Sequence, residues 1–245
     1  MKDIVLVAFD QFTDIDLFLM WDILGRNTED WRVRIVGAHQ ELSSAHGLTV
    51  RPHGPLSDAN HADAVLFSSG REGVPAALAD PDFMASFDLD PARQYIGSIC
   101  AGAYIVERLG LIPDGRVTTH PDAQGGLLDL GLEVLDQPLV CRGNVATAGG
   151  CLAALYLVGW LVESMFDADK RRETLLPLLP SGQQDIYENL IGLSIRQGVE
   201  QTETKSADSR RELRQEASIV RPALYQRTAH KDEMQPDIVK QSAGI

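Results

Sequence analysis

A short apolar strand passes directly into a helix in the stretch YIGSICAGA, residues 95–103. Ser98 and Gly102 stand two residues to either side of Cys100, so the chain can turn back sharply at the cysteine. Such a turn lifts the side chain at its apex out of the sheet and points backbone N–H groups toward it. Because a helix N-terminus stabilises negative charge, we expect the Cys100 thiol to ionise readily. The residues alone leave one alternative open, a small buried cysteine at a strand end.

Apolar runs and helical patterns alternate along the first 165 or so residues, which predicts an α/β fold with a mostly parallel sheet between two helical layers. The run at 31–36 alternates in polarity and is placed nearer a sheet edge than the continuously apolar runs. The expected strands are 4–9, 31–36, 64–67, 95–99 and 116–119, with hairpins at 42–50 and 139–147. The expected helices are 14–25, 75–79, 81–87, 101–109, 121–130, 151–166 and 183–196.

Three segments differ in composition. Residues 1–168 carry the alternating pattern and form the α/β domain, and residues 169–199 are expected to be a helical extension packed on it. Residues 200–245 are polar, poor in aromatic side chains and balanced in acidic and basic charge. That composition predicts a loosely attached helix or a disordered tail.

The net charge limits which partners are expected, and the cysteine content indicates the cellular compartment. The 245-residue chain has a formal net charge of −13, so it should repel nucleic acid and anionic membranes, and we expect neither as a partner. The longest apolar run, at 151–162, is too short to span a bilayer. Three widely spaced cysteines make no disulfide framework, and no signal peptide opens the chain. We therefore expect a cytoplasmic protein.

A nucleophilic Cys100 needs an oxyanion site and a proton carrier. Gly70 lies in a loop after a buried strand, and its N–H group could meet that of Ala101 near the thiol. Asp16 lies in the first turn of a helix, where a half-buried carboxyl group could have a raised pKa and shuttle a proton. A plain helix-capping role is the alternative, although Asp14 fits that role better.

His120 follows a short strand and precedes Pro121 and Asp122. One ring nitrogen could face Cys100 while Asp122 orients the other, although a simple bond to loop backbone is equally compatible with the sequence. The remaining histidines do not stand at metal-ligand spacing, and no glycine-rich phosphate loop is present, so we expect no metal and no cofactor. Cys141 and Cys151 are interpreted as structural.

Six short segments of the chain, in their order along the sequence, resemble the ThiJ/PfpI superfamily, whose members are related to class I glutamine amidotransferases. The similarity covers about residues 3–168, and the branch it most resembles contains isonitrile hydratases and the amidotransferase-like domains of some transcription regulators. The segments that carry it are 4–9, 15–17, 69–70, 98–102, 118–120 and 144–150. The resemblance implies a flavodoxin-like three-layer sandwich and a homodimer.

The resemblance also implies roles for single residues. Cys100 would be the nucleophile, Asp16 its acidic partner, and Gly70 and Ala101 the oxyanion donors, while His120 matches a Thr-Thr-His segment. Two positions differ from isonitrile hydratases: Ala101 replaces the Thr that follows the cysteine, and Ser68-Ser69-Gly70 replaces a Pro-Gly-Gly loop. Charged Arg71 follows that loop and is a candidate substrate-binding residue.

Three activities are compatible with these residues. The first is a cofactor-free hydratase or hydrolase acting on a small electrophile, with an isonitrile as the substrate that the resemblance implies. The second is a non-enzymatic redox sensor or ligand-binding protein, in which the Cys100 thiol is oxidised. The third is glyoxalase- or deglycase-like chemistry on methylglyoxal, which uses the same cysteine. The appended DNA-binding region of the related regulators is not expected, because the tail carries no net basic charge.

Overall fold

The computed structural model describes residues 1–112 and 114–200 of the chain. The predicted tail lies outside the described residues from residue 201 onward. Within the described ranges, no helix combines the length and the apolar character needed to cross a bilayer.

A seven-stranded sheet forms the centre, in the order β10-β11-β7-β6-β1-β2-β5. Neighbouring strands are parallel except β10 and β11, which form an antiparallel hairpin at one edge. The predicted fold class is confirmed, and β2 lies next to an edge as its alternating polarity indicated. The strands are β1 (Lys2–Val7), β2 (Trp31–Gly37), β5 (Gly54–Pro55), β6 (Ala64–Phe67), β7 (Tyr95–Ile99), β10 (Leu139–Arg142) and β11 (Val145–Ala148).

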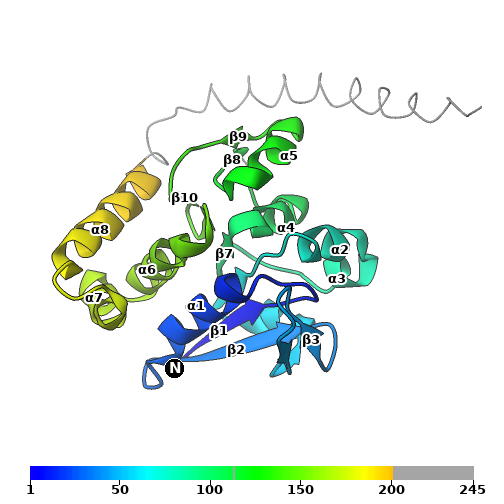
Figure 1. The fold of residues 1–245 in the computed structure, drawn as a ribbon, viewed down its shortest axis with the longest axis horizontal. Helices are drawn as coiled ribbons and strands as arrows, with labels where there is room; N and C mark the ends of the chain where they lie inside the picture. The colour runs from blue at the N-terminus through cyan, green and yellow to red at the C-terminus, as the bar shows by residue number, and fades with distance from the viewer. Residues whose placement is uncertain (113, 201–245) are drawn as a thin grey trace, which may run out of the picture. The chain divides into compact units, whose positions relative to one another are not determined.

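Helices cover both faces of this sheet (Figure 1). Along β1, Ile4 and Leu6 join one buried cluster, while Val5 and Val7 join a second cluster on the opposite face. The first face carries α1 (Asp14–Gly25), α6 (Ala154–Met165), α7 (Ala168–Leu175) and α8 (Gln184–Glu200). The second carries α2 (Gly73–Ala79), α3 (Pro81–Ala85) and α4 (Ala103–Arg108). The sheet therefore separates two cores, as the layered pattern predicts.

Two short sheets lie outside the central one. β3 (Leu42–Ser43) and β4 (Thr49–Val50) form the predicted antiparallel hairpin, and β8 (Arg116–Val117) pairs in parallel with β9 (Glu133–Val134). The strand predicted at 116–119 ends two residues early, because Thr118 and Thr119 form hydrogen bonds to other segments instead. The next predicted helix begins as a 3-10 turn and continues as α5 (Gln124–Asp129).

Helix α7 begins the segment expected to be a helical extension, but its bounds were not predicted, because its sequence is mostly polar and charged. It is held in place by Arg171, which is 6% exposed and forms ion pairs with Glu163 of α6 and Glu188 of α8. Asp167 caps the helix by accepting a hydrogen bond from the Lys170 N–H at 2.7 Å. A buried ion-pair network thus connects three helices where the hydrophobic pattern gives no signal.

Gly70 has no room for a side chain. A Cβ atom there would collide with the carbonyl oxygen of Gln11, whose backbone is fixed at φ 62° and whose N–H donates to the Ser43 carbonyl at 2.7 Å. We expect Gly70→Ala to lower the free energy of unfolding by about 1–3 kcal/mol, measured by urea denaturation. Gly25→Ala is the matched control, because nothing lies within 4 Å of its Cβ position. Equal stability of the two variants would contradict the close packing.

Candidate functional site

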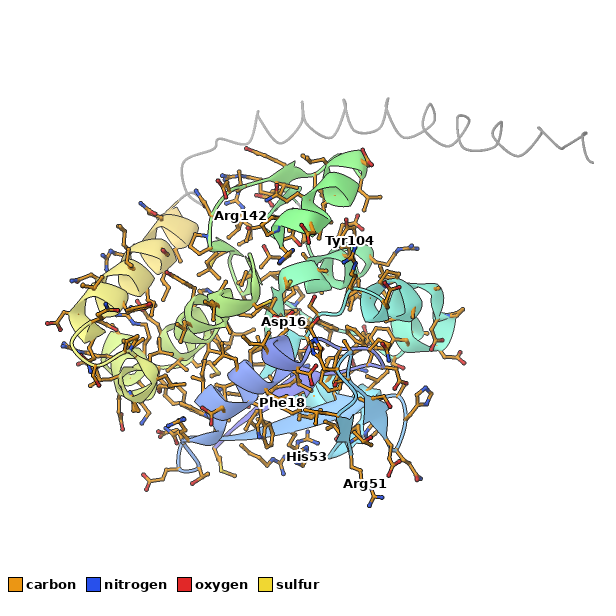
Figure 2. All side chains as sticks on the ribbon, in the orientation of Figure 1. Asp16, Phe18, Arg51, His53, Tyr104 and Arg142 are labelled. Atoms are coloured by element: carbon orange, nitrogen blue, oxygen red, sulfur yellow. The ribbon has the colours of Figure 1, made fainter. Side chains whose placement is uncertain are left out.

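Three side chains from distant parts of the chain meet at the carboxyl edge of the sheet. Cys100 follows β7, Asp16 lies in the first turn of α1, and Cys151 follows β11 after two glycines. The two Sγ atoms and one Asp16 carboxylate oxygen all lie within 4.8 Å of one another. Figure 2 labels Asp16 at the N-terminal end of α1, in the middle of the domain. The edge predicted to carry the site therefore holds this cluster.

The backbone at Cys100 takes the left-handed conformation, with φ 57°. Gln11, in the loop after β1, is the one other non-glycine residue with positive φ among the described residues. An L residue in this region costs on the order of 1–2 kcal/mol, and such strain is characteristic of functional turns. The Thr119 hydroxyl donates to the Cys100 carbonyl at 2.8 Å and holds the turn. The sharp turn expected between strand and helix is thus present at the cysteine.

The Cys100 thiol is nevertheless not poised to ionise. Its residue is 8% exposed, and burial, followed by the negative charge of Asp16, raises the thiol pKa well above its ordinary value. The Ser69 hydroxyl and the Ala101 N–H offset this only in part. The expected lowering of the pKa is wrong, because the first turn after the strand is a three-residue 3-10 segment within a buried environment rather than a long, exposed helix N-terminus.

Asp16 is completely buried, and neither of its carboxylate oxygens has a hydrogen-bond partner of good geometry. Burial raises the pKa of its carboxyl group, and the nearby thiols of Cys151 and Cys100 lower it only partly. This agrees with the raised pKa expected from the sequence. Asp14 does not cap the helix as predicted, because its carboxylate binds the Ser44 hydroxyl at 2.7 Å and His46 Nδ1 at 2.6 Å.

Ser69 is a site residue that the sequence analysis missed. Its hydroxyl accepts a hydrogen bond from the Ala101 N–H at 3.0 Å, and the same hydroxyl acts on both Cys100 and Asp16. The predicted oxyanion donor Ala101 is therefore already engaged, and a substrate oxygen or nitrogen would have to replace the Ser69 hydroxyl. The position of Ser69, two residues after the end of a buried strand, was the signal available for it.

His120 and Arg71 are the two remaining residues predicted for the site. His120 Nδ1 accepts the backbone N–H of Asp122 at 3.1 Å, whereas the Asp122 carboxylate is 3.8 Å away and 86% exposed. The predicted orienting carboxylate is thus replaced by a backbone bond, which places the proton of a neutral ring on Nε2. The charge of protonated His120 acts on Asp16 and lowers the pKa of that carboxyl group. Arg71 is exposed in the turn before α2.

Cys151 is the third member of the cluster, although its sequence context indicated a structural residue. It is partly exposed, and burial together with Asp16 raises the pKa of its thiol to about 11. A cavity of about 230 Å³ adjoins this part of the sheet edge, and neither Cys100 nor Cys151 lines it. Its lining residues are Thr118, Thr119, Pro121, Gln124, Asp136, Gln137, Pro138 and Gly149.

The buried Asp16 carboxyl group should lower the free energy of unfolding of the protein at neutral pH. Its folded-state pKa is raised above the ordinary 3.8, so below that value both states hold the proton and no penalty arises. As the pH rises above 3.8 the unfolded state ionises first, and stability is lost until the folded-state pKa is passed. We expect Asp16→Asn to raise the free energy of unfolding at pH 7 by about 0.5–2 kcal/mol. Urea titrations across pH measure this, and a gain that persists undiminished at pH 3 would contradict it.

Comparisons with known proteins show which proteins this chain is similar to. The family model described as the DJ-1/PfpI family matches residues 2–164. An isonitrile hydratase from Pseudomonas putida is 25% identical over 174 residues, covering 70% of this chain and 75% of the relative. A glutathione-independent glyoxalase DJ-1 from Schizosaccharomyces pombe is 36% identical over 78 residues, which cover 32% of this chain and 40% of the relative.

Solved structures show the same fold. A ThiJ/PfpI family protein from Pseudomonas syringae superposes with a TM-score of 0.66 at 20% identity, covering 80% of this chain and 88% of that one. Schizosaccharomyces pombe DJ-1 superposes with a TM-score of 0.64 at 23% identity, covering 74% of this chain and all of that one. Because the family model matches residues 2–164, well over half of the sequence, the chain belongs to the DJ-1/PfpI family.

Proposed function

We propose that the protein is a cysteine-dependent, cofactor-free hydratase that converts an isonitrile into an N-substituted formamide. The observation that carries the proposal is the pair formed by the Cys100 thiol and the Asp16 carboxyl group, which lie within 4.8 Å of each other in a buried site. The similarity to isonitrile hydratase over 70% of the chain supports the choice of substrate. An isonitrile is small and uncharged, which suits a site that disfavours ions.

The raised pKa of both groups suits a reaction in which the proton is transferred as the new bond forms. The sulfur of Cys100 attacks the terminal carbon of the isonitrile, and Asp16 moves the thiol proton to that same carbon. The product is a thioimidate on Cys100. Water then adds to the carbon of the thioimidate, the carbon–sulfur bond breaks, and the formamide leaves as the thiol regains its proton. No charge has to persist in the buried site at any stage.

In this proposal, Ser69 and Ala101 act on the substrate nitrogen. When water adds to the C=N bond of the thioimidate, negative charge develops on the substrate nitrogen. The Ala101 N–H, which donates to the Ser69 hydroxyl at 3.0 Å, becomes available to that charge once the hydroxyl turns away. The Ser69 hydroxyl can also donate a hydrogen bond itself. Together these groups offer a route to stabilising the thioimidate without a metal ion or an organic cofactor.

Incubation of the purified protein with cyclohexyl isonitrile tests the proposal, with the formamide proton followed by NMR. Formamide should appear in proportion to protein concentration, and quenching in acid should leave a thioimidate adduct on the peptide that contains Cys100. Absence of formamide above the buffer control, for both an alkyl and an aryl isonitrile, would overturn the proposed substrate.

Glyoxalase chemistry is the second candidate, favoured by the 36% identity of one segment to the Schizosaccharomyces pombe glyoxalase. The same thiol would add to the aldehyde carbon of methylglyoxal, and Asp16 would move the proton between the two carbons. Lactate production distinguishes this activity from isonitrile hydration. Equal turnover of both substrates would indicate a general site for small electrophiles.

A further inference from the structure

The cluster at the sheet edge contains a second thiol that isonitrile hydration does not use. Cys151 Sγ lies within 4.8 Å of both Cys100 Sγ and an Asp16 carboxylate oxygen. Cys151 is partly exposed, whereas Cys100 is 8% exposed and Asp16 is fully buried. One residue of the cluster is therefore partly exposed, while its two neighbours are buried.

Asp16 provides an independent sign that the three groups act together. Both of its carboxylate oxygens are buried and have no hydrogen-bond partner of good geometry among the described residues, although a buried polar atom normally has one. The thiols of Cys151 and Cys100 are the side chains that act most strongly on it. A neutral carboxyl group in this position can pass a proton from one sulfur to a group leaving the other.

We propose that Cys100 and Cys151 form an intramolecular disulfide when the protein meets a hydroperoxide. An S–S bond of about 2.05 Å requires the two sulfur atoms to approach by less than about 3 Å from their present separation. Cys151 can make this movement, because it begins a short 3-10 turn and follows Gly149 and Gly150, the second of which has φ 94°.

The reaction balances without any further reagent. The accessible sulfur of Cys151 attacks one peroxide oxygen, the O–O bond breaks, and Cys151 sulfenic acid and one molecule of water or alcohol result. Cys100 Sγ then attacks Cys151 Sγ, and the S–O bond breaks as the S–S bond forms. Asp16 gives its proton to the departing hydroxide and takes the proton of the Cys100 thiol. Two thiols are oxidised to one disulfide, and one peroxide is reduced.

Cys141 is an internal control, because it is a third cysteine placed outside the cluster. It lies in β10 at 2% exposure, and burial raises the pKa of its thiol well above the ordinary value. Trypsin separates all three cysteines, since they lie in the peptides 94–108, 117–142 and 143–170. A cross-link between the first and the third peptides therefore identifies the disulfide without ambiguity.

The full-length protein is treated with a small excess of hydrogen peroxide in chelator-containing buffer, alkylated, digested without reductant and analysed by mass spectrometry. We expect peptides 94–108 and 143–170 to be joined with the loss of about 2 Da, and dithiothreitol to reverse the change. Cys141→Ser should leave the yield unchanged. Cys100→Ser should instead accumulate a dimedone-reactive sulfenic acid on Cys151, at least about ten-fold faster than wild type.

Two results would overturn the proposal. One is oxidation of Cys100 to sulfinic acid while Cys151 remains a thiol. The other is no cross-link above the level of peptides containing Cys141, at peroxide concentrations that leave the fold intact by circular dichroism. The disulfide is tested by peptide masses and the proposed hydratase activity by isonitrile turnover. The two measurements are independent, so failure of one proposal does not decide the other.

Discussion

Replacement of Cys100 with alanine should reduce formamide production to the uncatalysed rate, a loss of at least about 10³-fold for removal of a nucleophile. The thioimidate on Cys100 cannot form without this sulfur, which lies within 4.8 Å of the Asp16 carboxyl group that supplies the proton. The rate is measured by NMR at saturating isonitrile, with the fold checked by circular dichroism.

Cys141→Ala is the matched control for this substitution. It removes the same sulfur atom from another buried cysteine, in β10, and should keep the wild-type turnover. Retention of activity by Cys100→Ala would assign the chemistry to another residue. Loss of activity in both variants would point to a general effect of cysteine removal on the fold.

Asp16→Asn should lower the turnover number by on the order of 10²–10⁴, the usual contribution of a positioned general acid–base. The amide keeps the shape of the carboxyl group but cannot carry the thiol proton to the isonitrile carbon. KM should change little, because the amide side chain fills nearly the same volume as the carboxyl group. The kinetics are measured beside the stability of the same variant, which is expected to increase at pH 7.

Asp14→Asn controls for the chemical change itself, because it alters a neighbouring carboxylate in the same helical turn. Asp14 binds Ser44 and His46 rather than the cluster, so its turnover should stay close to that of wild type. A loss of similar size in both variants would show that the helix N-terminus as a whole matters, and not the proton held by Asp16. An active and unchanged Asp16→Asn would remove Asp16 from the mechanism.

The fold was largely predictable because hydrophobic periodicity is a local property. The strands at 64–67 and 95–99 and helix α1 have the predicted bounds, since each buries a face that its own residues define. The bounds of helix α7 within the expected helical extension were not predictable, because Arg171 holds it through ion pairs with two other helices, and no local pattern records these.

The candidate site was predictable in position but not in chemistry. The rule that ligands bind at the carboxyl ends of parallel strands placed Cys100 and Asp16 at the same edge. It did not reveal Cys151, because an apolar sequence after it indicated only a buried helix. It also did not give the direction in which the pKa of Cys100 shifts, because the burial of the thiol and its proximity to the charge of Asp16 depend on packing between segments that are far apart in the sequence.

Neither edge strand of the central sheet, β5 or β10, is well suited to pair with a strand of another chain. The β5 margin is two residues long and includes Pro55, and the β10 margin is packed against α8. A neighbouring molecule therefore finds no long row of unpaired N–H and C=O groups to which it could add a strand. In crowded solution, this arrangement protects a protein rich in parallel strands from cross-β polymerisation.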